Sequence, residues 1–361
     1  PEQVALAVLL VCLLITACRA GFGSATPGMR IIALLGGLGS LWFMADMYRK
    51  PRSRCAQGLD TDQGHGRCEE SPTLRMIRRA WIPSCSMVLL FGIILCWTLS
   101  TVVVPDDWDA WNIWGAKAKV LALGAGPLAD VTHFGLADYP LLWPSIWAFC
   151  GWCYSGWEEQ WSRAWGPVFL LLTAWQIGVI VFRATGRKDA AFLGAAVFAS
   201  IPKVVVVASW SYAEAPLWLM MTCAFGRLLM TVQDDRKSDF LLAGCYAFAA
   251  AMTKNEGLLF AAFGLVWLLV SCGLGKWRRI LWFAVPLIGY LPWLCWTRVH
   301  LKLGTHASEG LSLSKTTLLH AWSRLYPAFV KVVQVWGDFQ QWSIVLYLLL
   351  AGMGMLIWKG G

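Results

Sequence analysis

The segment 105–144 carries the side chains best suited to acid–base chemistry, and it directly follows a long apolar run. Its ionisable residues include Asp106, Asp107, Asp109, His133 and Asp138. A carboxylate or an imidazole within hydrogen-bond reach of a reacting hydroxyl can take up its proton in the transition state. The segment is therefore a candidate site for general acid–base catalysis. The Trp residues of the segment could stack against sugar rings, could belong to an interfacial aromatic belt, or could do both.

The first three acids allow two interpretations. Acids between two helices can act as solvated caps that interact with the dipole of the next helix. Alternatively, they face a polar site at a membrane surface. Asp109 stands at the start of an expected helix, and we regard it as the functional candidate, whereas Asp106 and Asp107 are expected to be caps.

Further ionisable residues lie at the edges of later apolar runs. Glu214 stands in SYAEAPL, Lys254 and Glu256 stand in TKNEG, and Arg298 follows another run. Such residues are costly in a membrane unless they line a cavity, so several on one side predict a shared polar site. The alternatives are an acid at a helix N-terminus for Glu214 and a snorkelling side chain for Lys254.

The composition indicates which kind of fold must position these residues. Hydrophobic residues make up 58% of the chain and charged residues 14%, and the mean hydropathy is +0.57. A soluble globular domain would not tolerate this composition on its surface. Apolar runs long enough to cross a bilayer recur along the chain. We therefore expect an all-α fold, a polytopic transmembrane helical bundle.

The net charge of +9 does not indicate a nucleic-acid partner. Most basic residues fall in short gaps between apolar runs, at 49–79, 183–188, 236–237 and 276–279. An excess of Lys and Arg in such gaps is typical of cytoplasmic loops. We expect these gaps to be cytoplasmic and to meet anionic lipid headgroups.

About ten spans follow from the apolar runs and the charge rule. They are 4–18, 31–48, 81–104, 162–182, 189–207, 213–231, 239–253, 257–272, 280–297 and 343–358. Both ends of the chain then lie in the cytoplasm. The gaps expected on the far side are 105–161, 208–212, 254–256 and 298–342.

Interfacial helices are expected in the first large non-cytoplasmic loop. Apolar residues recur there at helical spacing, at Trp111, Trp114, Ala118 and Leu121, and the pattern stops at Gly124. This spacing predicts an amphipathic helix on the bilayer surface. The apolar segment 140–153 is too short to span comfortably, and we expect a re-entrant or interfacial helix.

The order of these motifs resembles that of the integral-membrane C-type glycosyltransferases (GT-C). This superfamily includes protein O-mannosyltransferases, the lipid A aminoarabinose transferase and the oligosaccharyltransferase catalytic subunit. The resemblance rests on the acid after an outward-going helix, the amphipathic segment ending in Gly, H…DYPLLWP, Trp161-Ser162-Arg163, SYAEAPL and TKNEG. It covers about residues 81–300, as a catalytic module whose catalytic loop is 105–161. Residues 1–80 look like an added helix pair with a cytoplasmic basic loop, and 301–361 like a non-cytoplasmic loop with a last helix.

The resemblance implies transfer of a sugar from a polyprenyl-phosphate donor to an acceptor, by a single displacement with inversion. It assigns the catalytic acids to Asp109, as base, and to Glu214, although the family more often has Asp at the second position. The family commonly has Tyr-Pro-Pro or Lys-Pro-Pro where this chain has Tyr139-Pro140-Leu141, so another cation must bind the donor phosphate. The candidates for phosphate binding are Lys254 and Arg298, and the supporting residues are Asp138, Tyr139, His133 and Arg163.

The resemblance leaves metal dependence open, because some relatives use a divalent cation and others do not. The sequence requires no cofactor, but Asp109, Asp138 and Glu214 would suit a hard cation such as Mg²⁺ or Mn²⁺. The expected partners are the lipid bilayer, the lipid-linked donor, and an acceptor that is a protein, a lipid or a glycan. The expected location is a bacterial inner (plasma) membrane, with the active site on the periplasmic or extracellular side.

Two other functions remain open at this point. A lipid-linked sugar flippase or transporter would use the same charges along a substrate pathway. Transporters usually show repeated halves, and the sequence has no convincing internal repeat. A non-catalytic GT-C-like membrane scaffold would keep the fold without the reaction.

Overall fold

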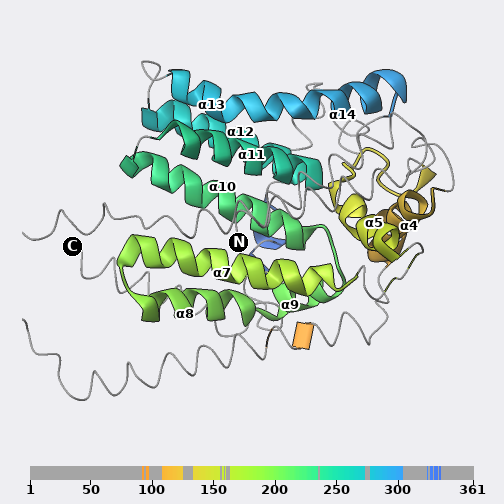
Figure 1. Ribbon diagram of the computed structural model, residues 1–361, viewed down its shortest axis with the longest axis horizontal. Helices are drawn as coiled ribbons and strands as arrows, with labels where there is room; N and C mark the ends of the chain where they lie inside the picture. The colour runs from red at the N-terminus through yellow and green to blue at the C-terminus, as the bar shows by residue number, and fades with distance from the viewer. Residues whose placement is uncertain are drawn as a thin grey trace, which may run out of the picture.

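A computed structural model describes residues 108–124, 133–154, 163–234, 236–272 and 277–303, together with isolated residues near 92–96, 157–159 and 323–334. Within this described part, every regular element is a helix and no strand is present (Figure 1). The expected all-helical class is thus confirmed for these residues. The expected spans 4–18, 31–48 and 343–358, and nearly all of 81–104, lie outside them.

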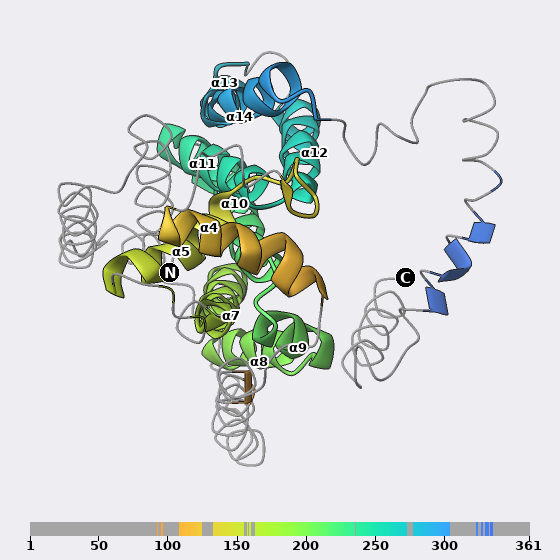
Figure 2. The same cartoon turned by 90° about the vertical axis from the view of Figure 1, so that its right-hand side faces the viewer.

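Most of the described helices run side by side as a bundle (Figure 1). They are α7 (Trp165–Thr185), α8 (Lys188–Ala199), α10 (Glu214–Asp234), α11 (Lys237–Thr253), α12 (Asn255–Cys272) and α13 (Trp277–Leu287). The chain continues from α13 through η4 (Ile288–Tyr290), α14 (Leu291–Cys295) and η5 (Trp296–His300). A second group lies across one end of this bundle (Figure 2). It consists of η1 (Ala110–Gly115), α4 (Ala116–Leu123) and α5 (Leu142–Tyr154).

Two of the described helices are long and apolar enough to cross a membrane. They are Trp165–Thr185 and the continuous helix Trp277–His300, with mean hydropathies of 1.8 and 1.5. A third span is added if α8 and α9 (Pro202–Ser209), which meet at an angle of 63°, count as one broken span. The helices expected over 213–231, 239–253 and 257–272 are present as α10, α11 and α12.

The break between α8 and α9 differs from the single helix expected over 189–207. Ile201 has an extended backbone with φ −72° and ψ 114°, and Pro202 begins α9. Proline disfavours helical geometry in the residue before it and cannot donate the hydrogen bond that a continuous helix requires. The dipeptide therefore ends one helix and begins the next, which redirects the chain toward α10.

Small residues let the helices approach closely. At Gly257 of α12, an added Cβ would overlap the Ala250 carbonyl of α11, and at Gly244 of α11 it would overlap the Phe283 carbonyl of α13. Such small-residue contacts are typical of membrane helix packing. They bring the α11–α12 turn and the α13 helix against the same core.

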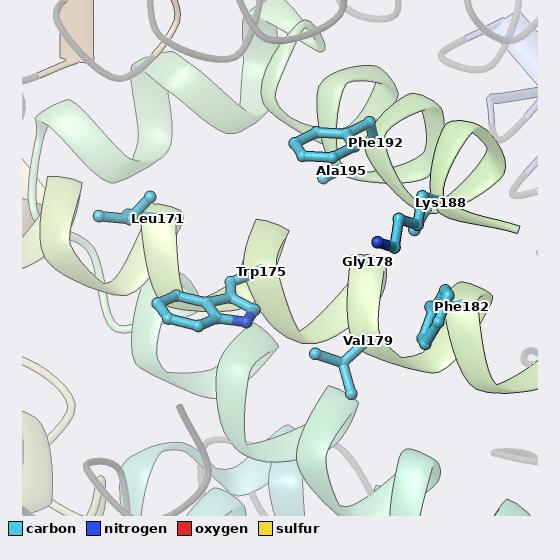
Figure 3. Close-up of a pocket in the computed structure, with 9 residues that line it drawn as sticks. Leu171, Trp175, Gly178, Val179, Phe182, Lys188, Phe192 and Ala195 are labelled. Carbon is cyan, nitrogen blue, oxygen red and sulfur yellow. The ribbon is translucent and has the colours of Figure 1, made fainter. Parts of the chain in front are cut away.

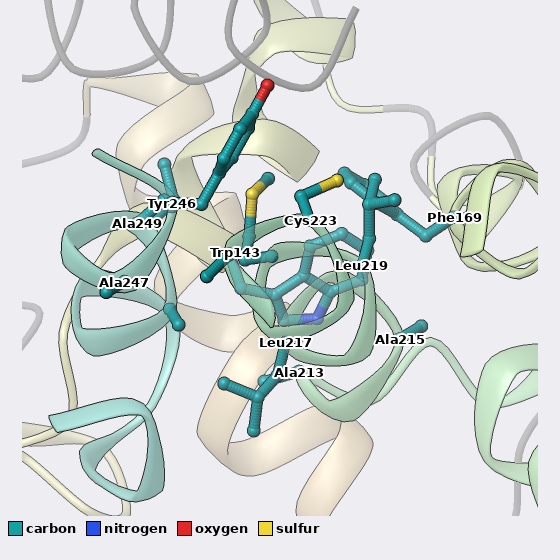
Figure 4. Close-up of a cluster of buried hydrophobic side chains, with 14 of the residues drawn as sticks. Trp143, Phe169, Ala213, Ala215, Leu217, Leu219, Cys223, Tyr246, Ala247 and Ala249 are labelled. Atoms are coloured by element: carbon teal, nitrogen blue, oxygen red, sulfur yellow. The ribbon is translucent and has the colours of Figure 1, made fainter. Parts of the chain in front are cut away.

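Trp143 of α5 fixes the crossing helices to the bundle. Its indole is fully buried beside residues of α10 and α11, among them Leu219 and Tyr246 (Figure 4). It meets the Phe169 ring of α7 nearly edge-on, at a centroid distance of 5.7 Å and an interplanar angle of 78°. Its Nε1 donates a hydrogen bond of 2.8 Å to the carbonyl of Ser211, just before α10. The helix expected over 140–153 is thus present and packs against the end of the bundle.

One end of the bundle carries basic residues in its helix connections. The connections α7–α8, α10–α11 and α12–α13 lie at one end, on the left in Figure 1. Their described basic residues are Arg183, Arg187, Lys188, Arg236, Lys237, Arg278 and Arg279. The opposite end holds the start of α10, the α11–α12 turn, the end of η5 and the crossing helices.

Candidate functional site

Glu214, Lys254, Asp138 and Arg298 meet at the end of the bundle that carries the crossing helices. Glu214 begins α10, and Lys254 separates α11 from α12. Asp138 comes from the loop before α5, which reaches toward α12 (Figure 2), and Arg298 comes from η5. Four segments that are distant in sequence thus contribute to one polar cluster.

The α11–α12 turn explains the position of Lys254. Lys254 ends α11 in an extended conformation, with φ −158° and ψ 151°, and its carbonyl accepts a hydrogen bond of 2.9 Å from the Gly257 amide. Gly257 has no side chain, so the first turn of α12 can lie directly against Ala250. The tight turn holds the lysine at the end of the bundle rather than along its side.

Lys254 lies between two carboxylates. Its Nζ is 2.7 Å from Glu214 Oε1 and 3.1 Å from Glu256 Oε1. The lysine side chain is 15% exposed and that of Glu256 is 53% exposed, so only the second acid can swing freely into solvent. Burial alone would lower the pKa of Lys254, but the two carboxylates outweigh burial and the net pKa is raised. The lysine therefore carries its charge at neutral pH.

Glu214 has one carboxylate oxygen to spare. Its Oε1 accepts the hydrogen bond from Lys254, whereas its Oε2 is buried and has no hydrogen-bond partner among the described residues. A buried carboxylate oxygen without a donor carries a desolvation cost. A substrate hydroxyl that donated to this oxygen would remove that cost.

Asp138 and Arg298 form the second part of the cluster. Asp138 is 5% exposed, and its Oδ2 accepts hydrogen bonds from Asn255 Nδ2 at 3.2 Å and from Arg298 Nη2 at 3.4 Å. Arg298 also donates to the Leu303 carbonyl, at 2.7 Å. The aspartate thus connects the start of α12 to η5.

Tyr139 connects the cluster to the crossing helices. Lys254 Nζ lies 5.9 Å from the centre of the Tyr139 ring, and this ring lies 5.6 Å from that of Trp114 in η1. Burial is the main cause that raises the pKa of Tyr139, and the charge of Glu256 adds to it. The phenol is therefore a neutral hydrogen-bonding group near the cluster.

Lys117 of α4 holds the loop that carries Asp138. Its side chain is fully buried, and its Nζ donates a hydrogen bond of 2.6 Å to the carbonyl of Leu136. Leu136 has a φ of 51°, and its carbonyl also accepts a hydrogen bond from the Tyr139 amide. Burial lowers the pKa of Lys117 to about 8, although the charge of Asp138 acts in the opposite direction.

Sequence reasoning missed Lys117, although the sequence contains a signal for it. Position 117 lies three residues after Trp114 and next to Ala118, on the face expected to be apolar. Of the four residues predicted for that face, Trp114, Ala118 and Leu121 are buried and Trp111 is half-buried. The helix also ends at Gly124, as expected, and this glycine has a left-handed conformation with φ 63°. A lysine on a buried face needs a polar partner, and the Leu136 carbonyl supplies it.

The other predicted site residues lie in segments other than those that form the cluster contacts: Asp109 before η1, His133 early in the loop before α5, and Arg163 just before α7. Asp109 is the residue before η1 and is exposed, and His133 is exposed at the start of the loop that leads to Asp138. Arg163 is 3% exposed, and its Nε lies 3.3 Å from Glu159 Oε1. Its carbonyl accepts a hydrogen bond from the Ser211 hydroxyl, so the residue contributes to packing before α7. Asp106 and Asp107 lie outside the described residues.

The acids of the cluster are arranged for cations of the protein itself. Among the described residues, no group of three or more His, Cys, Asp or Glu side chains is placed to hold a metal ion. Glu214 binds Lys254, and Asp138 binds Arg298 and Asn255. The geometry thus offers two fixed cations and an unsatisfied carboxylate oxygen, which suit a ligand that has both a phosphate and hydroxyl groups.

Comparisons of the chain with protein families, with curated proteins and with solved structures give no match.

Proposed function

We propose that this protein is a membrane glycosyltransferase that moves a sugar from a polyprenyl-phosphate donor to an acceptor at the non-cytoplasmic face. The observation that carries the proposal is the cluster of Lys254, Glu214, Asp138 and Arg298 at one end of the helical bundle. Ionisable residues at the end of an apolar bundle are typical of substrate sites. The isoprenoid tail of the donor would remain in the bilayer, with its phosphate at the level of the cluster.

Lys254 and Arg298 are the groups that would bind the donor phosphate. Glu256 is the most exposed partner of Lys254, so it can move away and leave one direction of the ammonium open to a phosphate oxygen. Arg298 is 29% exposed and keeps further N–H groups beyond its contact with Asp138. Both cations would stabilise the negative charge that grows on the leaving phosphate.

Asp109 would act as the base. In a single displacement, the acceptor oxygen forms a bond to the anomeric carbon while the bond from that carbon to the phosphate oxygen breaks. The acceptor proton passes to the Asp109 carboxylate, and the bonding electron pair leaves with the lipid phosphate. The helix η1 that follows Asp109 packs beside the cluster, because Tyr139 contacts both Trp114 of η1 and Lys254. Glu214 would position the sugar through its Oε2 and hold Lys254 through its Oε1.

The proposal includes a multi-pass topology of about ten spans. It places both chain ends in the cytoplasm and the site on the periplasmic side of a bacterial inner membrane. The basic residues of the helix connections support this orientation, because these connections lie opposite the cluster. A divalent cation at Asp109, Asp138 and Glu214 would be an addition to this mechanism rather than a requirement.

The test is sugar transfer by the purified full chain in liposomes that contain polyprenyl-phosphate sugars. Asp109→Asn should lower the rate by about 10²- to 10⁴-fold, the usual contribution of a general base. Asp189→Asn is the matched control, because Asp189 pairs with Arg187 at the basic end, and it should retain the rate. Repeating the assay with EDTA measures metal dependence.

Three results would contradict the proposal. Robust turnover by Asp109→Asn would rule out the base assignment. Movement of the donor lipid across the bilayer without sugar transfer would favour a flippase. Neither transfer nor translocation over a panel of sugars and acceptors would favour a non-catalytic scaffold.

A further inference from the structure

A groove of about 420 Å³ lies between α7 and α8. Its walls include Leu171, Trp175, Val179 and Phe182 from α7, and Phe192 from α8 (Figure 3). The helices approach closely below the groove, because Gly178 faces the backbone of Ala191. The small residues thus form the floor and the large apolar side chains form the rim.

The rim of the groove is unusually exposed for apolar residues. Trp175 is 51% exposed, Phe182 41% and Phe192 39%. The helix α7 is long and apolar enough to cross a membrane, and α8 is so when it is counted with α9 as one broken span. An exposed apolar rim on such helices fits contact with hydrocarbon rather than with water.

The length of the groove corresponds to one leaflet. Leu171 and Phe182 mark its two ends on α7, and the eleven residue steps between them span about 16 Å of helix. The hydrocarbon core of a bilayer is about 30 Å thick, so one leaflet contributes about 15 Å. One acyl chain that lies along α7 would therefore occupy the groove from end to end.

The one charged side chain among the described residues that line the groove is Lys188, at its basic end. Its Nζ is directed into the groove near Gly178 (Figure 3). The nearby acid Asp189 is already bound, at 2.6 Å, to Arg187. The ammonium therefore provides a positive charge at the basic side of the groove, and such charges attract anionic lipid headgroups.

We propose that the α7–α8 groove binds an anionic phospholipid of the leaflet at the basic end, with its phosphate at Lys188 and one acyl chain along α7. This site is separate from the proposed sugar-transfer site, which lies at the opposite end of the bundle. The lipid would be a structural ligand that fills a groove which the side chains of the described residues leave open.

The experiment is native mass spectrometry of the delipidated full chain in detergent, titrated with phosphatidylglycerol and with phosphatidylcholine of the same acyl chains. Phosphatidylglycerol should bind more tightly to the wild type. Lys188→Ala should weaken its binding about fivefold, the loss expected from one Lys near an anionic headgroup. Lys237→Ala is the control, because Lys237 is exposed at the same end and does not line the groove, and it should change binding less than twofold.

A second variant tests the apolar part of the site. Val179→Phe fills the groove from its rim and should weaken the binding of both lipids. Equal effects of Lys188→Ala and Lys237→Ala, or equal binding of the two lipids to the wild type, would overturn the proposal. A dimer that Val179→Phe dissociates would also overturn it, because a second copy of the chain would then occupy the groove.

Discussion

Lys254 and Lys117 are two buried or half-buried lysines that the fold uses in different ways. Lys254 keeps its charge because Glu214 and Glu256 lie within 3.1 Å. Within the described part of the chain, the ammonium of Lys117 has a backbone carbonyl as its hydrogen-bond partner, so burial is the main influence on its pKa. The first lysine can serve a charged ligand, whereas the second serves the loop that carries Asp138.

We predict that Lys117 makes stability depend on pH between about 8 and 10. Its pKa falls from 10.5 to about 8 in the folded protein, so the unfolded chain binds more protons in this interval. Stability should therefore rise with pH, by up to about 2–3 kcal/mol, and be lost as pH falls through the folded pKa. The pKa of Tyr139 is raised in the folded protein, so its contribution to stability should fall as pH rises above about 10. This opposing effect sets the upper limit of the interval.

The measurement is the midpoint of unfolding in detergent at pH 7 to 10, for the wild type and for Lys117→Met. The pH-dependent gain should disappear in the variant, because methionine fills the same space without a proton to release. Parallel curves for the two proteins would show that Lys117 does not titrate in this interval.

At the scale of elements, the sequence predicts helices best where a particular residue type marks the end of the helix. Gly124 ends α4 as expected, and the Lys254 interruption separates α11 from α12. Pro202 also carried a signal, but the apolar run around it concealed the break between α8 and α9. The pairing of Asp138 with Arg298 was beyond sequence reasoning, because 160 positions separate the residues and only the packing of η5 brings them together.

We predict that Gly257 is required for the geometry of the α11–α12 turn. In Gly257→Ala, the added methyl would overlap the Ala250 carbonyl, and backbone cannot move aside as a side chain can. The unfolding free energy should fall by about 1–3 kcal/mol. Gly194→Ala is the control, because its methyl would lie 3.2 Å from a Val181 side-chain methyl that can adjust. Equal losses in the two variants, measured by unfolding in detergent, would contradict the prediction.

For the whole molecule, the position of the basic helix connections bears on how the proposed reaction could work. A polyprenyl-phosphate donor needs its phosphate at the membrane surface where the acceptor lies. The basic connections, including Arg187 and Lys237, favour the cytoplasmic side for the other end. The cluster around Lys254 then faces away from the cytoplasm.

We predict that an antibody binds a peptide tag inserted in the full chain beside His133 when only the outer membrane of the cells has been permeabilised. A tag inserted beside Gly186, an exposed residue between α7 and α8, should be bound only after the inner membrane is permeabilised. Both insertions lie in connections between helices, so neither should disturb the bundle. The reverse pattern would place the cluster in the cytoplasm, where a nucleotide-linked donor would be more accessible. Asp109 could then still act as a base, but the position of the cluster would no longer be an argument for a lipid-linked donor.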